Sequence, residues 1–341
     1  MVQTSAFSLL IQNWYIENHR DLPWRNTDSP YFIWLSEVIL QQTRVVQGLD
    51  YYHKFTRLFP TVHDLANASE QEILNTWQGL GYYSRARNLH KTAKHVDQQY
   101  NGVFPDSYKE LLSLPGVGPY TAAAIASFAY NLPHAVVDGN VFRVLSRVFS
   151  VDTPIDSTKG KKEFSELADN LLDKTHPGRH NQAIMELGAL VCSPKSPDCS
   201  SCPIEEICSA RASGNQENFP VKEKKTKVRN RYFHFLLIEE KNKLVIQQRK
   251  GKDIWENMYQ LPLIETPSPE LNIEKSSFSE PMASYSHQLS HQKIHALFYK
   301  TPEIPKEVDV SRCRWIEKEE LNDLPLPRLI DRFFEEQEQD S

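Results

Sequence analysis

The sequence lacks the features that would place the protein in a membrane or outside the cell. It contains no run of about 18 apolar residues, the length that a helix needs to cross a bilayer. It starts MVQTSAF and so lacks the basic and then apolar segment of a secretory signal. We therefore expect a cytoplasmic protein with no membrane partner, in a reducing compartment that disfavours disulfide bonds.

The sequence also lacks an excess of positive charge, internal repeats and low-complexity stretches. Its net charge at pH 7 is -5, which gives no support for a bulk affinity for nucleic acid. Its 341 residues exceed what one small core usually organises, so we expect two domains. Residues 214–231 are polar and basic and have no apolar periodicity, which is typical of a linker. We therefore predict domains at residues 1–213 and 232–341.

Cysteine is scarce, yet four of the five cysteines lie within 17 residues. Their order is Cys192-x6-Cys199-x2-Cys202-x5-Cys208. Because such a cluster of unrelated core cysteines is rare and disulfides are disfavoured, we interpret the four as metal ligands. Zinc and iron–sulfur clusters both bind four cysteines, but zinc sites usually pair two C-x2-C knuckles and only one is present. The longer outer spacings favour a 4Fe-4S cluster held by residues 192–208 and leave Cys313 as a packing residue.

Before the linker, apolar side chains recur at helical spacings. Ser29 followed by Pro30 is typical of a helix start, and apolar residues follow at steps of three and four up to Val46. Ser107 and Glu110 form a capping-box pattern before another apolar segment. We therefore predict that the first domain is all-α or nearly so.

After the linker, the pattern changes to that of strands. Residues 231–238 and 243–248 are predicted as strands around a short turn, residues 294–299 as a further strand, and residues 326–334 as a closing helix. We therefore predict an α+β fold for residues 232–341, and a multidomain protein as a whole.

Gly116 and Gly118 lie between two predicted helices, in the segment Leu114-Pro-Gly-Val-Gly-Pro-Tyr-Thr-Ala122. Glycines at these positions permit a tight turn whose backbone N–H groups face outward beside the start of the next helix. Such a helix-hairpin-helix binds a phosphate backbone without sequence preference, which would let a mildly acidic domain hold DNA. An ordinary helix corner would explain Gly-x-Gly alone, but the flanking residues make the hairpin pattern more specific.

Two carboxylates have opposite predicted surroundings. Glu37 lies inside an apolar predicted helix, near Trp34 and Leu40, and burial there raises the pKa of a carboxyl and keeps it protonated. Asp138 precedes another predicted helix, whose N–H groups and dipole favour an ionised carboxylate. A proton donor and an anion are what the cleavage of a glycosidic bond needs. The plainer interpretations are an N-cap for Asp138 and an ion pair with a core arginine for Glu37.

These features together resemble the helix-hairpin-helix DNA glycosylases that hold an iron–sulfur cluster, and among them the adenine DNA glycosylases of the MutY type. The similarity rests on the cysteine spacing, on residues 114–122 and on the motifs Ser36-Glu-Val-Ile-Leu-Gln-Gln-Thr43 and Val136-Val-Asp-Gly-Asn-Val141. It covers essentially the whole chain. It implies a monomeric enzyme of base-excision repair, nucleoid-associated if bacterial, that acts on double-stranded DNA. Such an enzyme flips out adenine mispaired with 8-oxoguanine or guanine, removes it and leaves an abasic site.

The resemblance also implies roles for individual residues. Glu37 would protonate adenine at N7, Asp138 would stabilise the sugar cation, and Asn140 lies beside Asp138. Tyr120 takes the place of the catalytic lysine of relatives that also cut the strand. The residues that fill the base stack would be Gln42, Leu80 and Tyr82, and those of the adenine pocket would be Trp24, Arg25 and Gln182.

Residues 232–341 resemble the Nudix-like domain with which these enzymes inspect the opposite strand. A Nudix box rich in glycine and glutamate is missing from the sequence, so we expect no metal-dependent hydrolysis by this domain. The candidate contacts to 8-oxoguanine are His287, Leu289, Ser290 and His291. Two positions depart from the family pattern: Leu289 replaces an aromatic residue, and Glu256-Asn-Met258 replaces a glycine-rich stretch.

Two other functions fit parts of the sequence. A glycosylase and lyase of the endonuclease III type, acting on oxidised pyrimidines, would need a lysine at position 120 and no second domain. A non-catalytic iron–sulfur sensor that binds DNA would have no use for a helix-buried Glu37 or for Asp138 at a helix start. The sequence therefore favours the monofunctional adenine glycosylase.

Overall fold

The protein forms two compact units. The computed structural model describes residues 2–223, 228–270 and 280–339. The first unit contains residues 1–67 and 88–225, and the second contains residues 68–87 and 226–341. No described helix is both long enough and apolar enough to cross a membrane.

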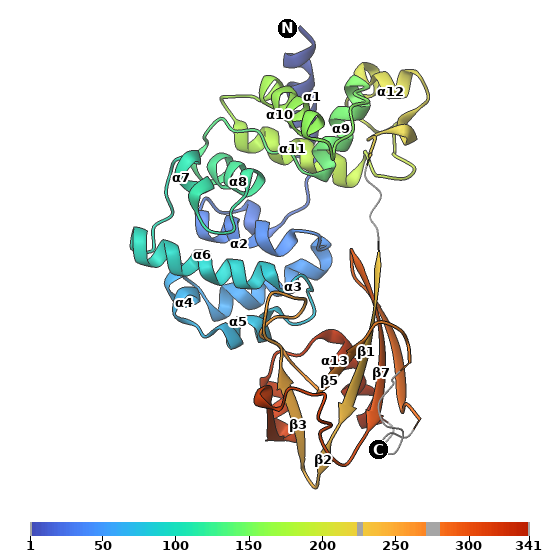
Figure 1. Ribbon diagram of the computed structural model, residues 1–341. Coiled ribbons are helices and arrows are strands. Elements are labelled where there is room, and N and C mark those ends of the chain that lie inside the picture. Colours follow the sequence, from blue (N-terminus) through green and yellow to red (C-terminus); the bar gives the residue numbers. More distant parts are fainter. Residues whose placement is uncertain (1, 224–227, 271–279, 340–341) are drawn as a thin grey trace. The chain divides into compact units, whose positions relative to one another are not determined.

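The first unit is helical (Figure 1). Its α-helices are α1 (Val2–Asn18), α2 (Pro30–Leu40), α3 (Val45–Leu58), α4 (Val62–Asn67), α7 (Tyr108–Ser113), α8 (Pro119–Tyr130), α9 (Gly139–Phe149), α10 (Thr158–Leu171), α11 (Pro177–Leu190) and α12 (Ser209–Ala212). Its short 3-10 helices are η1 (Pro23–Arg25), η2 (Glu205–Ile207) and η3 (Gln216–Asn218). The described part of residues 1–213 contains no strand, so the all-α prediction is confirmed.

The helix starts follow capping rules that the sequence already indicates. Ser29 is the N-cap of α2 and Pro30 its first residue, as predicted. At α7, the Ser107 hydroxyl accepts a hydrogen bond from the Glu110 N–H at 3.3 Å and donates one to the Glu110 carboxylate at 2.5 Å. Only the Ser107 half of the predicted capping box therefore forms, because the Glu110 carboxylate accepts from the Ser107 hydroxyl and not from the Ser107 N–H.

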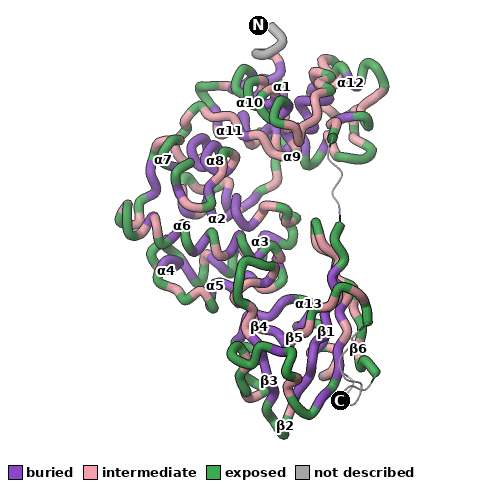
Figure 2. The backbone as a smooth tube through the Cα atoms, viewed as in Figure 1, coloured by how far each residue is buried: buried purple, intermediate pink, exposed green. Residues whose placement is uncertain are grey.

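The core of the first unit lies among α1, α8, α9, α10 and α11. Phe7 of α1 and Phe164 of α10 are fully buried in it. The colouring of Figure 2 shows long buried stretches in α2 and α8. On α2, eight of the eleven residues are buried, and Glu37 is one of them.

The described part of the second unit contains two four-stranded sheets and three α-helices or parts of them. The strands are β1 (Arg229–Leu237), β2 (Glu239–Glu240), β3 (Lys243–Gln248), β4 (Tyr259–Gln260), β5 (Leu263–Thr266), β6 (Ala283–Gln288), β7 (Gln292–Lys300) and β8 (Cys313–Glu317). The helices are α5 (Glu70–Trp77), the start of α6 (Ser84–Tyr100), which runs on into the first unit, and α13 (Arg328–Gln339), with the 3-10 helices η4 (Val310–Arg312) and η5 (Lys318–Asp323). The predicted α+β class is confirmed.

The two sheets differ in their topology. The first has the order β5-β1-β7-β6, in which β1 pairs parallel with β7 and antiparallel with β5. In the second, β3 pairs with β2, β4 and β8. The ends of the predicted linker are structured, because η3 and the first residues of β1 fall within residues 214–231. Cys313 packs against a small core around Leu236 and Val245.

Truncation of Phe333 should destabilise the second unit. This α13 side chain is fully buried and stacks on Phe298 of β7 with 4.1 Å between ring centroids. Replacement of a core phenylalanine by alanine costs about 3–5 kcal/mol, so Phe333→Ala should lower the free energy of unfolding by that amount in urea titrations followed by tryptophan fluorescence. Val310→Ala is the control, since that side chain is 59% exposed. Equal effects of the two changes would contradict this packing.

Candidate functional site

Glu37 of α2 is nearly enclosed, with 7% of the residue exposed. Its Oε2 accepts a hydrogen bond from the Tyr120 hydroxyl of α8 at 2.5 Å. Burial raises the pKa of Glu37 to about 7; the Tyr120 bond opposes this rise, the charge of Asp138 adds to it, and the charge of Arg25 opposes it. The partner is thus a tyrosine hydroxyl, where the plainer interpretation expected an arginine. Near neutral pH this carboxyl can hold a proton and release it.

Asp138 is the N-cap of α9, as predicted. One carboxylate oxygen accepts a hydrogen bond from the Val141 N–H at 2.7 Å, and the other accepts one from the Asn140 side-chain amide at 2.8 Å. These bonds favour the ionised form, yet burial raises the pKa of Asp138 above its ordinary value. The sequence indicated the helix terminus and gave no sign of this burial. The two carboxyls lie close enough for the charge of Asp138 to raise the pKa of Glu37.

A chain of hydrogen bonds leads from Asp138 to the cysteine loop. Arg143, on the buried side of α9, donates to Asn140 Oδ1 at 2.8 Å and to the Cys192 carbonyl at 2.7 Å. It also donates to the Gly188 carbonyl at 2.7 Å. A Cβ at position 188 would lie 2.7 Å from the Asn140 Cβ. The glycine therefore lets α11 approach the Asp138-Asn140 turn closely.

Trp24 and Arg25, predicted for the adenine pocket, lie in η1. Trp24 is buried and packs edge-on against Tyr52 with 5.1 Å between ring centroids. Arg25 donates two hydrogen bonds to Glu186 of α11, at 2.9 and 2.6 Å, and Arg20 donates to the same carboxylate at 2.8 and 2.6 Å. Burial acts to raise the pKa of Glu186, but these bonds hold it at about 2. An ionised carboxylate thus fixes both arginines.

Gln182, the third predicted pocket residue, lies one turn before Glu186 on α11. Its Oε1 accepts a hydrogen bond from the Tyr15 hydroxyl of α1. The amide nitrogen takes no part in this bond and carries two N–H donors. Trp24 and Arg25 therefore lie on η1, and Gln182 lies on α11. Glu186 of α11 connects the two elements through its hydrogen bonds with Arg25.

The two glycines of the predicted hairpin meet different constraints. Gly116 has φ +76°, in the left-handed region, and a Cβ there would lie 2.8 Å from the Asn88 Cβ, so glycine is needed on both grounds. Gly118 has φ -94° as the N-cap of α8, a value that any residue adopts. A Cβ on Gly118 would meet nothing within 4 Å. The missing side chain therefore leaves the N-terminus of α8 open to an anion from outside.

The three residues predicted to enter the base stack differ in exposure. Gln42 follows α2 and Tyr82 precedes α6, and both have positive φ angles of 57° and 48°. Tyr82 is 45% exposed, whereas Leu80 is 7% exposed. A contact of Leu80 with DNA would therefore need a change in its loop.

Arg85 holds the loop that carries Tyr82. Its Nη2 donates to the Gly81 carbonyl at 3.2 Å and to the Leu80 carbonyl at 3.3 Å. Its guanidinium lies 5.0 Å from the Trp77 ring centroid and 5.6 Å from that of Tyr82. Burial lowers the pKa of Arg85 to about 10, so the group remains a cation that stacks on both rings.

The predicted reading loop is the turn between β6 and β7. The Leu289 N–H donates to the Gln292 carbonyl at 2.8 Å and closes the turn. Ser290 and His291 are exposed at its tip. The Ser290 hydroxyl is hydrogen-bonded to the Tyr82 hydroxyl within the second unit. One predicted stack residue and one predicted reader thus lie side by side.

The segment that departs from the glycine-rich family pattern is accommodated in the fold. Trp255 and Asn257 have positive φ angles of 58° and 65°, and asparagine tolerates this region better than most residues do. The Asn257 amide donates to Glu70 of α5 at 2.7 Å. Trp255 packs against His287 with 6.0 Å between ring centroids, and burial lowers the pKa of His287. Trp255, the residue just before the departing segment, therefore contacts one of the predicted reading residues.

The four clustered cysteines line one enclosed hollow together with Arg147 of α9. Arg147 is 1% exposed, and its Nη1 lies 3.3 Å from the Cys192 Sγ. Burial raises the pKa of Cys202 to about 12 and also raises that of Cys208. Within the described residues, no three His, Cys, Asp or Glu side chains already form a site for one metal ion.

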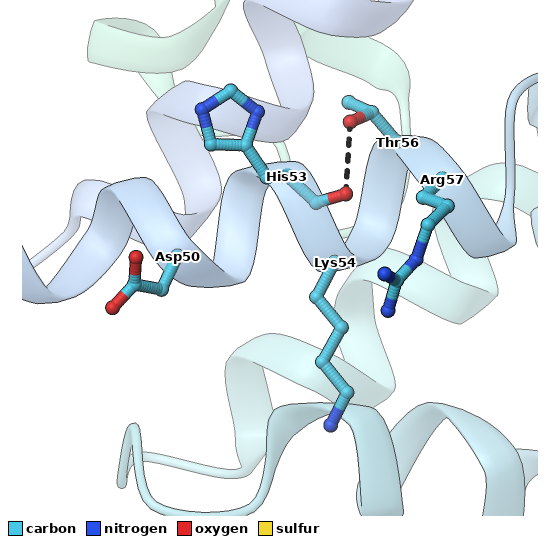
Figure 3. Close-up of a pocket in the computed structure, with 5 residues that line it drawn as sticks. All are labelled: Asp50, His53, Lys54, Thr56 and Arg57. Carbon is cyan, nitrogen blue, oxygen red and sulfur yellow. Dashed lines mark hydrogen bonds between the residues drawn. The ribbon is translucent and has the colours of Figure 1, made fainter.

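An open hollow of about 570 Å³ lies along α3, outside the set of predicted residues. Figure 3 shows its lining side chains, Asp50, His53, Lys54, Thr56 and Arg57. The Thr56 hydroxyl donates to the His53 carbonyl at 3.2 Å. The lining comes from a single exposed helix face and mixes both signs of charge, and we assign it no role.

The sequence did not identify five charged residues that are buried in the structure. They are Arg85, Arg143, Arg147, Glu186 and Arg231, each 9% exposed or less. For Arg143 and Arg147 a signal was present, because they stand four residues apart in the apolar stretch Val141-Phe-Arg-Val-Leu-Ser-Arg-Val148. Glu186 carried no comparable signal, since its arginine partners lie more than 160 residues away in sequence.

Removal of the Tyr120 hydroxyl should raise the pKa of Glu37. The hydroxyl donates to the ionised form of the carboxyl and so lowers its pKa. We expect the Glu37 titration in Tyr120→Phe to move to higher pH, as followed by carbon-13 NMR of the glutamate carboxyls. Tyr108→Phe, which changes a tyrosine on α7, should leave that titration in place. A downward move in Tyr120→Phe would contradict the role of the bond.

The chain matches two protein families. Residues 35–170 match the HhH-GPD superfamily of base excision DNA repair proteins, and residues 233–336 match the NUDIX domain. Among solved structures, it is similar to a thermostable thymine-DNA glycosylase, at 30% identity and a TM-score of 0.58 over 62% of this chain and 97% of that one. An endonuclease III–DNA complex, at 23% identity and a TM-score of 0.53 over 63% of this chain and 98% of that one, shares the fold.

Its curated relatives agree in name. An adenine DNA glycosylase of Buchnera aphidicola subsp. Baizongia pistaciae is 35% identical over 88% of this chain and 86% of its own length. The human adenine DNA glycosylase is 44% identical over 64% of this chain and 41% of its own length. The glycosylase-like helical unit, the NUDIX match and these relatives lead to one assignment: the chain belongs to the adenine DNA glycosylase family.

Proposed function

We propose that the protein excises adenine mispaired with 8-oxoguanine, or with guanine, from double-stranded DNA. The excision hydrolyses the N-glycosidic bond of a flipped adenine and leaves an abasic site. This proposal rests mainly on one pair of carboxyls. Glu37 is buried, has a pKa of about 7 and lies near Asp138 at the start of α9. The curated relatives are named adenine DNA glycosylases, which supports adenine as the excised base.

The two carboxyls would divide the chemistry. Glu37 would give its proton to N7 of adenine, which makes the base a better leaving group. Asp138, whose ionised form is favoured by the N–H of Val141 and the amide of Asn140, would stabilise the positive charge that develops on the sugar. The Tyr120 bond fixes the rotamer of Glu37. Water would then add its hydroxyl to C1′ of the sugar and give its proton to the Glu37 carboxylate, so the reaction needs no covalent intermediate on a lysine.

The first alternative, an endonuclease III-type glycosylase and lyase, is not favoured. A lyase needs an amine to form a Schiff base with the opened sugar, and Tyr120 offers a hydroxyl that is already bonded to Glu37. A non-catalytic sensor is also not favoured, since a desolvated carboxyl near pKa 7 is a costly feature for a protein that only binds.

We assign the remaining predicted residues to DNA binding. The N-terminus of α8 at Gly118, beside the tight turn at Gly116, would hold a phosphate. Trp24, Arg25 and Gln182 would line the base pocket, and Gln42, Leu80 and Tyr82 would fill the stack. We expect the protein to act as a monomer. If its host is a bacterium, it would meet this substrate at the nucleoid.

The β6–β7 turn would read 8-oxoguanine. Oxidation turns N7 of guanine from an acceptor into an N–H donor, so a reader needs an acceptor at that place. The exposed Ser290 hydroxyl is a suitable acceptor, with His287, Leu289 and His291 around it. Its bond to the Tyr82 hydroxyl supports this assignment, because Tyr82 is the residue expected to enter the stack.

We also propose a 4Fe-4S cluster on Cys192, Cys199, Cys202 and Cys208. All four cysteines line one hollow, and their outer spacings of six and five residues favour a larger group over zinc. The cation of Arg147 beside Cys192 suits a set of thiolates. The cluster would hold the loop in shape and orient DNA, since the proposed reaction transfers no electron.

The activity test is excision from duplexes that carry adenine opposite 8-oxoguanine, guanine, cytosine or thymine, followed by alkali to reveal abasic sites. Glu37→Gln should lose about 10²–10⁴-fold in single-turnover rate, because the amide has no proton to transfer, while mismatch binding persists. The wild-type rate should fall as pH rises through about 7, where Glu37 loses its proton. The matched control is Glu110→Gln, at an exposed position on α7. A Glu37→Gln rate close to that of the control would remove Glu37 from the mechanism.

Ser290→Ala should weaken the preference for 8-oxoguanine over guanine. An unpaired polar group costs about 1–3 kcal/mol, or roughly 5- to 150-fold in affinity, and the variant would lose most of that difference. The measurement is binding to the two mismatches with a non-cleavable adenine analogue. Ser286→Ala changes an exposed serine on the same hairpin and should discriminate like the wild type. Full discrimination by Ser290→Ala would mean that another element reads the lesion.

Purified protein should contain about four irons per chain and absorb in the visible blue, because four thiolates suit such a cluster. Cys199→Ala should lose iron, whereas Cys313→Ala should retain it, since Cys313 lies in the other unit. Stoichiometric zinc in anaerobically prepared protein would contradict the assignment.

A further inference from the structure

The four clustered cysteines differ in the hollows that they line. Cys199 lines the enclosed hollow that it shares with Cys192, Cys202 and Cys208. It also lines a second, open hollow of about 560 Å³, whose described lining includes none of the other three cysteines. Cys199 is therefore the one of the four cysteines that borders this outer hollow in the described part of the chain.

Each cysteine sulfur has an N–H group beside it, and the source of that group differs. Cys192 has the Arg147 guanidinium at 3.3 Å. Cys202 receives the backbone N–H of Ile204, and Cys208 receives that of Arg211. These donors suit thiolates, because they stabilise the negative charge that a bound cluster leaves on sulfur.

Cys199 has a different kind of donor, the side-chain amide of Gln216, whose Nε2 lies 3.6 Å from the Cys199 Sγ. Gln216 belongs to η3, after the last of the four clustered cysteines, and lines both hollows. It therefore borders the outer hollow and also contacts the sulfur.

Gln216 is fixed in this position by its own backbone. The Arg147 Nε donates to the Gln216 carbonyl at 2.9 Å, so the arginine that meets Cys192 also anchors the residue that meets Cys199. The chain after η3 is held as well, because Phe219 is 9% exposed and the Val221 carbonyl accepts from the Ile155 N–H at 3.0 Å.

We propose that Gln216 is a positioning residue for the cluster, which donates an N–H to the Cys199 thiolate and covers the solvent side of that sulfur. This inference rests on the cluster assigned under the proposed function. The amide would draw charge from the thiolate and so favour the more reduced form of the cluster. Its bulk would keep water and oxidants in the outer hollow away from the iron–sulfur bond.

Two variants separate these effects from general damage. Gln216→Leu keeps much of the bulk and removes the N–H, while Gln216→Ala removes both. Asn218→Ala is the matched control, since it removes an amide from the same 3-10 helix and the same outer hollow.

The readout is cluster loss, followed as bleaching of the visible absorbance and as released iron caught by a chelator. Anaerobic protein with measured iron content is mixed with ferricyanide, which takes one electron from the cluster. We expect Gln216→Ala to lose its cluster about tenfold faster than the wild type. Gln216→Leu should lose it at an intermediate rate, and Asn218→Ala at the rate of the wild type. Gln216→Leu should also have a lower reduction potential than the wild type in spectroelectrochemical titration.

Two failures are distinguishable. If the wild type holds no iron, the proposed cluster is wrong and this inference falls with it. If the wild type holds about four irons and Gln216→Ala loses them no faster than Asn218→Ala, the cluster stands and the role of Gln216 is wrong.

Discussion

The first unit depends on two guanidinium groups buried along one side of α9. Arg143 and Arg147 are 8% and 1% exposed, and a cation is tolerated at such depth only when its donors are satisfied. Here they are satisfied by backbone carbonyls at Cys192, Ser193 and Gly188. Those carbonyls belong to α11 and the cysteine loop, so the two arginines fix both against the helix that begins at Asp138. A change in either arginine would disturb the cysteine loop and the carboxylate together.

Burial acts to raise the pKa of two carboxyls of this unit, yet the two end in opposite protonation states. Glu37 and Glu186 are almost equally hidden, at 7% and 1% exposure. Glu37 meets one hydroxyl and keeps a pKa of about 7, whereas Glu186 meets two arginines and is held at about 2. The hydrogen-bond partners of each carboxyl, and not its degree of burial, therefore decide which of the two carries a proton. Ionised Glu186 holds Arg20 and Arg25 in place, whereas Glu37 can act as a proton donor.

Capping patterns and the spacing of apolar residues were enough to predict those parts of the fold and the site that depend on residues close together in sequence. The N-caps at Ser29 and Asp138, the apolar helix around Glu37 and the class of each unit followed from spacing and composition. The departures came from long-range packing: the burial that raises the pKa of Asp138, the enclosure of Leu80 and the two arginines on Glu186. No window of the sequence contains both partners of such contacts, so they could not be read from it.

The parallel pairing of β1 with β7 has a consequence for how the second unit is made. Its register runs from Arg229 opposite Gln292 to Leu237 opposite Lys300, so β1 leaves the ribosome about 63 residues ahead of its partner. At about 5–20 residues per second this delay is roughly 3–13 seconds. During that time Phe233 and Phe235, both fully buried in the finished sheet, have no β7 to cover them. The nascent chain thus presents an apolar strand to other chains, and slower translation through residues 238–291 would lengthen its exposure to aggregation.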